Sequence, residues 1–295
     1  MFSKIKTMKY TKNSSDDIKK IKNWIKEADA IVIGGGAGLS ASGGLNYYDV
    51  ELVKKWFPEY YKMGFNSLPA LQGRYWVLKD SNPQKYWGYW ARHIYHIRYE
   101  TELLKSHSLL YELVKDKDHF IITSNADGQF EKTEFSKERI FAPQGDYAFF
   151  QCSEPCSDEI YYNAHMVRTM IDNMISPYEI DKKDIPLCPR CNKPLVPNLR
   201  CDNTFVETPH MKNLGDYKGF INKNKGKKLL FLELGIGYNT PGLIRYPFEI
   251  MTQEFENASL VRINKSDSRL NENLKNKAIS LGEDIIKVLE KLLNK

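Results

Sequence analysis

Apolar and polar positions follow two patterns along the chain, one of helical spacing and one of short continuous apolar runs. Behind a capping Ser14 or Ser15, four apolar residues recur at helical spacing: Ile18, Ile21, Trp24 and Ile25. Short apolar runs then occur at residues 30–33, 120–122, 139–141, 229–234 and 260–263. Runs of this length are typical of strands that are buried on both faces of a parallel sheet. The pattern predicts an α/β fold, a Rossmann-like, doubly wound parallel sheet.

Other segments of the chain predict helices and a small inserted module in addition to this sheet. Residues 45–100 are rich in aromatic side chains and too long for a simple crossover, so we expect a helical module there. A helix around residues 102–115 returns the chain to the sheet, and apolar spacing over residues 269–293 predicts one or two surface helices. We expect residues 1–147 and 206–295 to form the large domain, and residues 148–205 to form a small inserted module.

Composition and charge narrow the classes of function. The chain has 295 residues, of which 42% are hydrophobic, so it can bury a sizeable core. Its net charge is +6, but Lys and Arg are spread along the chain, which favours attraction to anions such as phosphates. The N-terminus lacks the pattern of a signal peptide, and no run approaches the ~20 apolar residues that span a bilayer. We therefore expect a cytoplasmic protein that binds neither nucleic acid nor a membrane.

A glycine-rich segment, Gly34-Gly35-Gly36-Ala37-Gly38, follows the first predicted strand. The order of strand, glycine loop and helix lets backbone N–H groups approach a pyrophosphate in an α/β fold. The spacing does not match the dinucleotide fingerprint, because Leu39 or Ala41 occupies the position of the third glycine. Taken alone, the segment is equally compatible with a plain tight turn between a strand and a helix.

Candidate ligand-binding segments follow three of the other predicted strands. The segment Thr123-Ser124-Asn125-Ala126-Asp127-Gly128 follows the run at 120–122, and Gly235-Ile236-Gly237 follows the run at 229–234. The carboxyl ends of parallel strands form the ligand-binding edge of such a sheet, so Asn125 and Asp127 are candidates for a site, with a plain Asn-Asp-Gly turn as the alternative. Asn264 ends the last predicted strand, where it could bind a ribose or simply cap the strand.

Four of the five cysteines occur in two close pairs, Cys152 with Cys156 and Cys188 with Cys191. Two pairs of thiolates can converge on one Zn²⁺ in tetrahedral geometry, and a site closed by four protein ligands is structural. Five cysteines are too few for a disulfide scaffold in a chain of this size, and unligated thiols are the alternative. We expect a structural zinc site, with a helix in residues 158–175 between the pairs and with Cys201 as an incidental thiol.

Taken in order, these segments resemble the motifs of sirtuins over roughly residues 30–264, beginning with Gly36-Ala37-Gly38-Leu39-Ser40. The resemblance implies an NAD site in the large domain. It implies that Asn125 contacts the nicotinamide ribose or holds a water, and that Asp127 orients the nicotinamide carboxamide. The NAD contacts that it implies are Gly36, Ala37, Gly38, Ser40, Ser124, Asn125, Asp127, Gln144, Gly235, Gly237, Asn239 and Asn264.

One position departs from the deacylating sirtuins. Where they carry a histidine that acts as a general base on a ribose hydroxyl, this chain has Gln144, within Pro143-Gln144-Gly145-Asp146. An amide does not titrate near neutral pH and therefore cannot serve as that base. In an extended segment Asp146 would point the same way as Gln144 and could act as a base or stabilise positive charge, with a solvated loop carboxylate as the alternative.

These departures resemble the macrodomain-linked class of microbial sirtuins, which implies NAD-dependent protein ADP-ribosylation with release of nicotinamide. The implied acceptor is a lipoylated carrier similar to the glycine-cleavage H protein, with a macrodomain hydrolase as functional partner and a setting in oxidative stress. The implied catalytic residues are Asn125, Asp127, Gln144 and Asp146. Two alternatives stay open: a protein-lysine deacylase that uses Asp146 as its base, and a module that binds NAD or ADP-ribose without turnover.

Overall fold

A six-stranded, fully parallel sheet is the largest element of the computed structural model, which describes residues 15–274 and 276–294. The strand order is β11-β10-β9-β1-β2-β3. The strands are β1 (Ala30–Gly35), β2 (His119–Thr123), β3 (Ile140–Phe141), β9 (Leu229–Leu234), β10 (Ser259–Ile263) and β11 (Ala278–Leu281). All six residues of β1 and of β9 are buried, as the continuous apolar runs predict.

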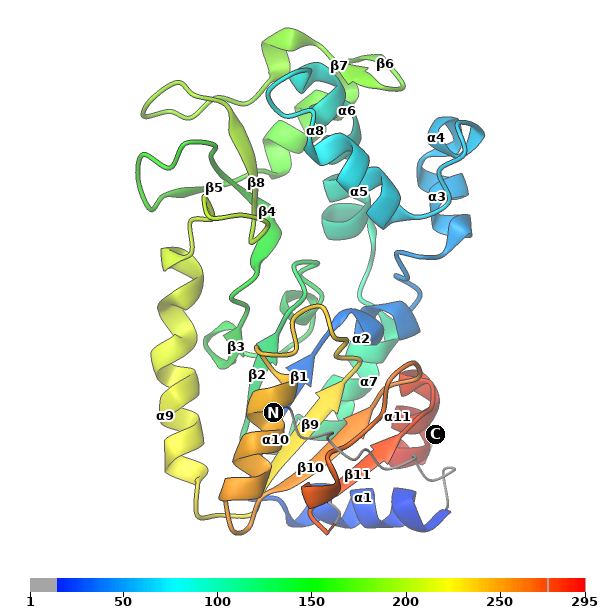
Figure 1. The fold of residues 1–295 in the computed structure, drawn as a ribbon, viewed down its shortest axis with the longest axis vertical. Coiled ribbons are helices and arrows are strands. Elements are labelled where there is room, and N and C mark those ends of the chain that lie inside the picture. The colour runs from blue at the N-terminus through cyan, green and yellow to red at the C-terminus, as the bar shows by residue number, and fades with distance from the viewer. Residues whose placement is uncertain (1–14, 275, 295) are drawn as a thin grey trace, which may run out of the picture.

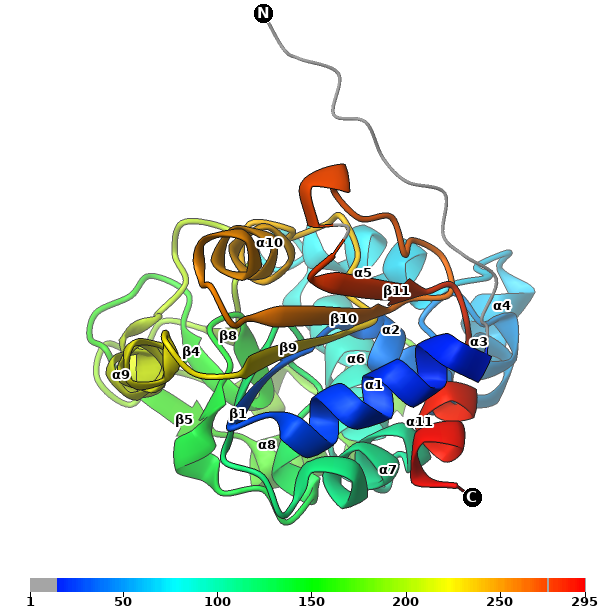
Figure 2. The same ribbon diagram turned by 90° about the horizontal axis from the view of Figure 1, so that it is seen from below.

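Helices cover both faces of this sheet, as the view in Figure 2 shows. On one face, α1 (Ser15–Glu27), α7 (Lys105–Val114) and α11 (Ile285–Leu293) share a core with Ile31 and Ile33. On the other face, α9 (Leu214–Asn224) and α10 (Arg245–Glu254) pack on Ala30 and Val32. Successive β1 side chains therefore alternate between two cores, and the predicted doubly wound α/β fold is confirmed.

A second body of elements lies beyond the carboxyl ends of the strands, in the upper half of Figure 1. Its helices are α3 (Val50–Trp56), α4 (Pro58–Lys62), α5 (Leu68–Trp76), α6 (Pro83–Ile94), a π-helical turn η1 (Tyr95–Glu100) and α8 (Ala164–Asp172). Its strands are β4 (Gly145–Cys152), β5 (Ile160–Tyr162), β6 (Met174–Ser176), β7 (Glu179–Ile180) and β8 (Leu195–Leu199). The aromatic helices and the antiparallel β5-β4-β8 sheet share one core, in which the rings of Trp87 and Phe150 are 4.7 Å apart.

Short 3₁₀ helices connect these elements: η2 (Phe130–Lys132), η3 (Lys137–Arg139), η4 (Lys182–Asp184), η5 (Thr208–Asn213) and η6 (Glu272–Leu274). Within the described residues, no helix combines the length and the hydropathy that a bilayer crossing requires.

The prediction for residues 269–293 is wrong in part. Its second half forms α11, but Ala278–Leu281 forms β11, an edge strand that pairs in parallel with β10. A run of four residues is too short to separate the strand period from the helical one, so only the pairing partner decides. Likewise, only part of residues 158–175 is helical: α8 forms the expected helix, and the strand β5 precedes it.

Candidate active site

The candidate site lies at the carboxyl ends of β1, β2, β9 and β10. The chain leaves β1 for β2 on one side and later adds β9 on the other side, so β1 stands at the point where the strand order reverses. Open α/β sheets bind their ligands at this point. The segments that contain Gly36, Asn125, Gly235 and Asn264 all begin directly after these strand ends. We call these four strand ends and the loops that follow them the rim.

Glycines let two loops of the rim pack backbone against backbone. A Cβ on Gly36 would lie 2.7 Å from the carbonyl oxygen of Gly235, and one on Gly38 would lie 2.7 Å from the Gly235 Cα. Gly235 itself has φ +67°, a conformation that side chains disfavour. The Gly36 and Gly38 N–H groups donate to the carbonyl oxygens of Leu234 and Gly235, both at 3.0 Å. These two N–H groups are therefore engaged within the protein, so the glycines serve the loop packing first.

A buried triad of side chains joins the first two motifs. Ser40, in the short helix α2 (Ala37–Ser42), donates to Asp127 Oδ2 at 2.6 Å and accepts from Asn125 Nδ2 at 3.1 Å. Asn125 Nδ2 also donates to the Gly36 carbonyl oxygen at 3.1 Å. Ser40 and Asp127 are buried, whereas Asn125 and Ser124 are half-buried. The structure thus brings together Ser40, Asn125 and Asp127, which the sequence offered as separate candidates.

The Asp127 carboxyl group has an altered proton affinity. Burial raises its pKa, and hydrogen bonds from Ser40 and from the Gln129 N–H oppose the rise. Its oxygens already accept these two hydrogen bonds. Asp127 is therefore a fixed acceptor at the floor of the site, suited to orienting a polar ligand group.

Asn264 fixes the other end of the rim. Its Nδ2 donates to the Ile236 carbonyl oxygen at 2.8 Å, and its Oδ1 accepts from the Ser266 and Asp267 N–H groups, each at 3.0 Å. Gly237 and Asn239 lie exposed in the loop after β9, whereas Gly235 is buried. Asn264 therefore holds the loop that carries these three residues, in addition to any ligand role.

A fully buried ion network supports this end of the rim from below. Arg262 Nε and Nη2 donate to the two carboxylate oxygens of Glu233 at 2.7 and 2.8 Å. Arg245 lies 3.9 Å from Glu233 and donates to the carbonyl oxygens of Ile236 and Asp267. Burial raises the Glu233 pKa, and the two arginines lower it. The network links β9 and β10 to both loops that would meet the adenosine half of NAD.

Residues 143–146 connect β3 to the start of β4, and Arg200 holds their first half. The Arg200 N–H donates to the Gln144 carbonyl oxygen at 3.1 Å, and Arg200 Nε donates to the Pro143 carbonyl oxygen at 3.2 Å. The Gln144 side chain is half-buried, and among the described residues it has no hydrogen-bond partner. Its amide therefore remains available to a ligand.

Asp146 is not a solvated loop carboxylate. Arg98 Nε and Nη2 donate to its two oxygens at 2.8 and 3.1 Å, and the Ala148 N–H donates to Oδ1 at 2.7 Å. Between Gln144 and Asp146, Gly145 has φ +95° and packs against the Asn198 carbonyl oxygen. The segment is therefore not regularly extended there, so the alternation argument for a common direction of Gln144 and Asp146 does not apply.

A buried polar cluster, which the sequence analysis did not predict, lies behind β4. His93 Nε2 lies 3.3 Å from the Tyr147 hydroxyl and 3.1 Å from Gln72 Nε2, and His93 Nδ1 lies 2.9 Å from the Tyr89 hydroxyl. Burial lowers the His93 pKa to about 3, so the imidazole is neutral. Tyr147 follows Asp146 directly, and its N–H donates to the Ala126 carbonyl oxygen at 3.0 Å. The cluster thus supports both the Asn125–Asp127 loop and β4.

The four paired cysteines converge. The Sγ atoms of Cys152, Cys156, Cys188 and Cys191 all lie within 4.8 Å of one another. The closest contacts are 3.4 Å between Cys152 and Cys191 and 3.7 Å between Cys156 and Cys188. Tetrahedral zinc with Zn–S bonds of about 2.3 Å separates its sulfur ligands by about 3.8 Å. The donor set and its spacing fit a structural Zn²⁺, and Cys201 is exposed and outside the cluster.

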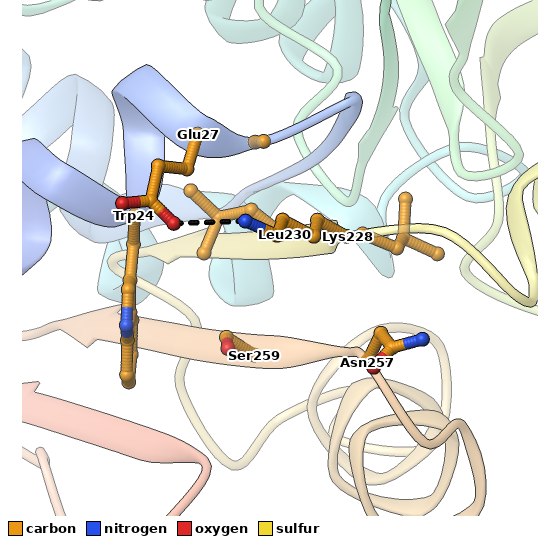
Figure 3. Close-up of a pocket in the computed structure, with 8 residues that line it drawn as sticks. Trp24, Glu27, Lys228, Leu230, Asn257 and Ser259 are labelled. Atoms are coloured by element: carbon orange, nitrogen blue, oxygen red, sulfur yellow. Dashed lines mark hydrogen bonds and ion pairs between the residues drawn. The ribbon is translucent and has the colours of Figure 1, made fainter.

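A cavity of about 210 Å³ lies at the opposite end of the sheet (Figure 3). It is lined by Trp24 and Glu27 of α1, by Lys228 before β9 and by Asn257 and Ser259 at the start of β10. Lys228 and Glu27 form an ion pair of 3.0 Å across it. Ligands of open α/β sheets bind at the carboxyl ends of the strands, so this cavity is not part of the candidate site.

Comparisons with known proteins agree with this architecture. The chain is 35% identical over 268 residues to a protein ADP-ribosyltransferase from Staphylococcus aureus, which covers 88% of this chain and 82% of the relative. It is 30% identical over 251 residues to a probable bifunctional ADP-ribose hydrolase/ADP-ribosyltransferase from Fusarium oxysporum f. sp. cubense, spanning 82% of this chain but only 41% of that relative. A scan against protein-family models gives no match.

Solved structures show the same fold at low sequence identity. A Sir2 protein bound to a propionylated peptide superimposes with a TM-score of 0.54 at 17% identity, over 94% of this chain and 97% of that one. A Sir2–p53 peptide–NAD⁺ complex gives 0.55 at 16% identity over the same shares, and a mutant Sir2 homologue with ADP-ribose gives 0.58 at 16% over 94% and 95%. The chain belongs to the family of sirtuin-fold, NAD-dependent protein ADP-ribosyltransferases.

Proposed function

We propose that this transferase modifies a lipoylated carrier protein similar to the glycine-cleavage H protein. The observation that carries the proposal is Gln144, whose unpartnered amide stands where deacylating sirtuins have their histidine. The triad of Asn125, Ser40 and Asp127 supplies fixed polar groups. A site with intact polar groups but without an imidazole base suits transfer better than deacylation.

The proposed reaction breaks one bond to the ribose and forms another. The bond between the anomeric carbon of the ribose and the nicotinamide nitrogen breaks, and the nitrogen keeps the electron pair. The acceptor nucleophile forms a bond to the same carbon and loses its proton to a base or to solvent. Positioning of the two partners and stabilisation of the positively charged sugar supply much of the barrier reduction.

We assign the residue roles on this basis. Asn125 contacts the nicotinamide ribose, Asp127 orients the nicotinamide carboxamide, and Gln144 positions the ribose or the acceptor. Asp146 lies beside them as part of an ion pair with Arg98. The glycine loop, Ser40, Ser124, Gly235, Gly237, Asn239 and Asn264 hold the remainder of NAD.

Several wider features belong to the same proposal. A macrodomain hydrolase that removes ADP-ribose is the functional partner, which the name of the Fusarium relative supports because it combines a hydrolase with a transferase. Residues 148–205 belong to the zinc module, and the described parts of residues 1–147 and 206–295 belong to the NAD-binding domain. The helical module at about residues 45–100 is counted with that domain, although it shares its core with the zinc module. The protein works in the cytoplasm, since its zinc thiolates need a reducing compartment. The setting in oxidative stress rests on the resemblance to the macrodomain-linked class.

A protein-lysine deacylase is the second candidate function. It would need a base in place of the sirtuin histidine, and Asp146 is the carboxylate closest in sequence to Gln144. All the oxygens of Asp146 accept hydrogen bonds in the present structure, which disfavours that use.

Intact mass spectrometry tests the proposal. The lipoylated carrier, its unlipoylated form and an acetyl-lysine peptide are each incubated with NAD and the protein. An ADP-ribose increment on the lipoylated carrier alone is the expected result. Modification of both carrier forms would contradict the lipoyl requirement, and a deacetylated peptide would favour the second candidate.

A further inference from the structure

Arg98 connects two segments that both belong to the candidate site. It lies in the π-helical turn η1 at the end of the helical module. Its guanidinium binds both carboxylate oxygens of Asp146, 48 residues later in the chain, at 2.8 and 3.1 Å. Such two-pronged pairs fix the relative orientation of their partners as well as their distance. Both side chains are largely shielded, with 15% and 14% exposed.

The same guanidinium packs against the loop that carries Asn125 and Asp127. Gly128 has φ +69°, and a Cβ added there would lie 2.2 Å from Arg98 Cζ and 2.4 Å from Arg98 Nε. The absence of a side chain at Gly128 therefore makes room for Arg98. Through one residue, the Asn125–Gly128 loop is locked to the strand that follows Gln144.

Arg98 also lies among three acidic groups. Asp127, Asp146 and Glu131 all interact electrostatically with one another and with Arg98. Burial, followed by the charge of Asp146, raises the Glu131 pKa to about 7. The nearby Lys132 is engaged by the Thr101 carbonyl oxygen. Lys132 also interacts electrostatically with Asp127 and Asp146, so loss of Arg98 would lower the positive charge around these carboxylates without removing it.

We infer that Arg98 is a positioning residue for the transferase, holding the Asn125–Gly128 loop and the Gln144–Asp146 segment in register through its contacts with Gly128 and Asp146. The inference rests on the proposed role of these two segments in the reaction. Asp146 then acts as the anchor of Arg98, and its carboxylate does not accept the proton of the acceptor.

The test measures kcat and KM for NAD from nicotinamide release, which does not depend on the identity of the acceptor. Arg98→Lys keeps the charge but loses the fork and the contact with Gly128. We expect kcat to fall about 10- to 100-fold, while KM changes less than about threefold. Arg98→Met removes the charge as well, so its KM should also rise.

Arg168→Lys is the matched control, because Arg168 forms an exposed ion pair with Asp172 on α8 at 3.1 Å. It should leave both parameters unchanged. Wild-type kcat in both Arg98 variants would overturn the inference, whereas a wild-type protein that releases nicotinamide without modifying the lipoylated carrier would overturn only the acceptor proposal.

A double-mutant cycle with Asp146→Asn separates positioning from base catalysis. If Arg98 and Asp146 act as one unit, Arg98→Lys combined with Asp146→Asn should cost little more than either change alone. Additive losses would contradict the inference. If the Arg98 variants do not fold, the pH profile of Asp146→Asn decides: an unchanged acid limb of kcat supports positioning, and loss of that limb identifies Asp146 as a base.

Discussion

The rim of the sheet and the Gln144–Asp146 segment are held in place by different means. At the rim, backbone packs on backbone, with Gly36 and Gly38 against Gly235, and buried ion pairs support the loops. Residues 143–146 instead depend largely on two arginines from elsewhere in the chain. The Arg200 main chain and side chain bind the carbonyl oxygens of Gln144 and Pro143, and the Arg98 side chain binds Asp146. The part of the site that would hold adenosine is thus positioned by the parallel sheet. The part that would perform the reaction is positioned by the second body of elements, which lies beyond the carboxyl ends of the strands.

Removal of a zinc ligand should have the largest effect, because it should disrupt the Gln144–Asp146 segment. Cys152 ends β4, the strand that begins at Gly145 and includes Asp146, so the metal and the reaction segment share one strand. Structural zinc contributes about 10–16 kcal/mol of apparent binding free energy, and this energy drives local folding. In Cys188→Ser we expect zinc content and transfer to fall below detection.

Cys201→Ser is the matched control, since Cys201 is exposed and outside the cluster. Metal analysis and transfer to the carrier are measured on both variants. Full transfer by zinc-free Cys188→Ser would contradict the dependence of the reaction segment on this module.

Asn125→Ala should have the next largest effect, on the rim side. It removes the proposed ribose contact and the hydrogen bonds to Ser40 and Gly36, so we expect nicotinamide release to fall at least about 10²-fold. Asn222→Ala, on the exposed face of α9, is the control for the same substitution. Unchanged turnover with intact circular dichroism would remove Asn125 from the reaction.

Acid pH should lower the free energy of unfolding, because two buried histidines are neutral in the folded protein. Burial lowers the pKa of His93, behind β4, and of His107, on α7, to about 3. Unfolded histidine binds a proton near pH 6.5, so between that pH and about 3 the unfolded state holds more protons and stability falls as the pH falls. At pH 5 each histidine should cost about 2 kcal/mol of unfolding free energy relative to neutral pH.

The two histidines can be separated. Among the described residues, His107 Nε2 is buried without a hydrogen-bond partner, whereas His93 contacts Tyr147 beside Asp146. Denaturant unfolding between pH 5 and 7 measures how the free energy of unfolding depends on pH. This pH dependence should be shallower in both His107→Leu and His93→Leu, with transfer retained in the first variant and reduced in the second. An unaltered slope in both variants would contradict the assignment.

The cavity of Figure 3 should have the smallest effect, because it lies at the amino ends of the strands. Lys228→Ala breaks only an exposed ion pair with Glu27, and such pairs contribute about 0–1 kcal/mol. We expect KM for NAD to stay within about twofold of wild type, because ligands of open α/β sheets bind at the carboxyl ends of the strands. A large rise in KM would place part of the NAD site at the wrong end of the sheet.

The two regions also differ in how far the sequence predicts them. Asn125, Asp127, Gly235 and Asn264 are recognisable because they follow three predicted strands, β2, β9 and β10, and parallel topology then gathers the strand ends. Arg98 and Arg200 carry no local signal, since their partners lie 48 and 57 residues away and depend on how the second body packs. The positive φ of Gly145, which defeats the alternation argument for Asp146, likewise occurs where Gly145 packs against the Asn198 carbonyl oxygen of β8, 53 residues later in the chain.

The most direct test of the account is the initial rate of ADP-ribose transfer by Gln144→Ala, followed by intact mass spectrometry of the lipoylated carrier. The Gln144 side chain makes no hydrogen bond to the described protein residues, so the variant should unfold at the wild-type temperature. The account predicts that transfer falls about 10²-fold in this folded protein. Transfer at the wild-type rate would contradict the claim that Gln144 replaces the sirtuin histidine as a working residue of the transferase.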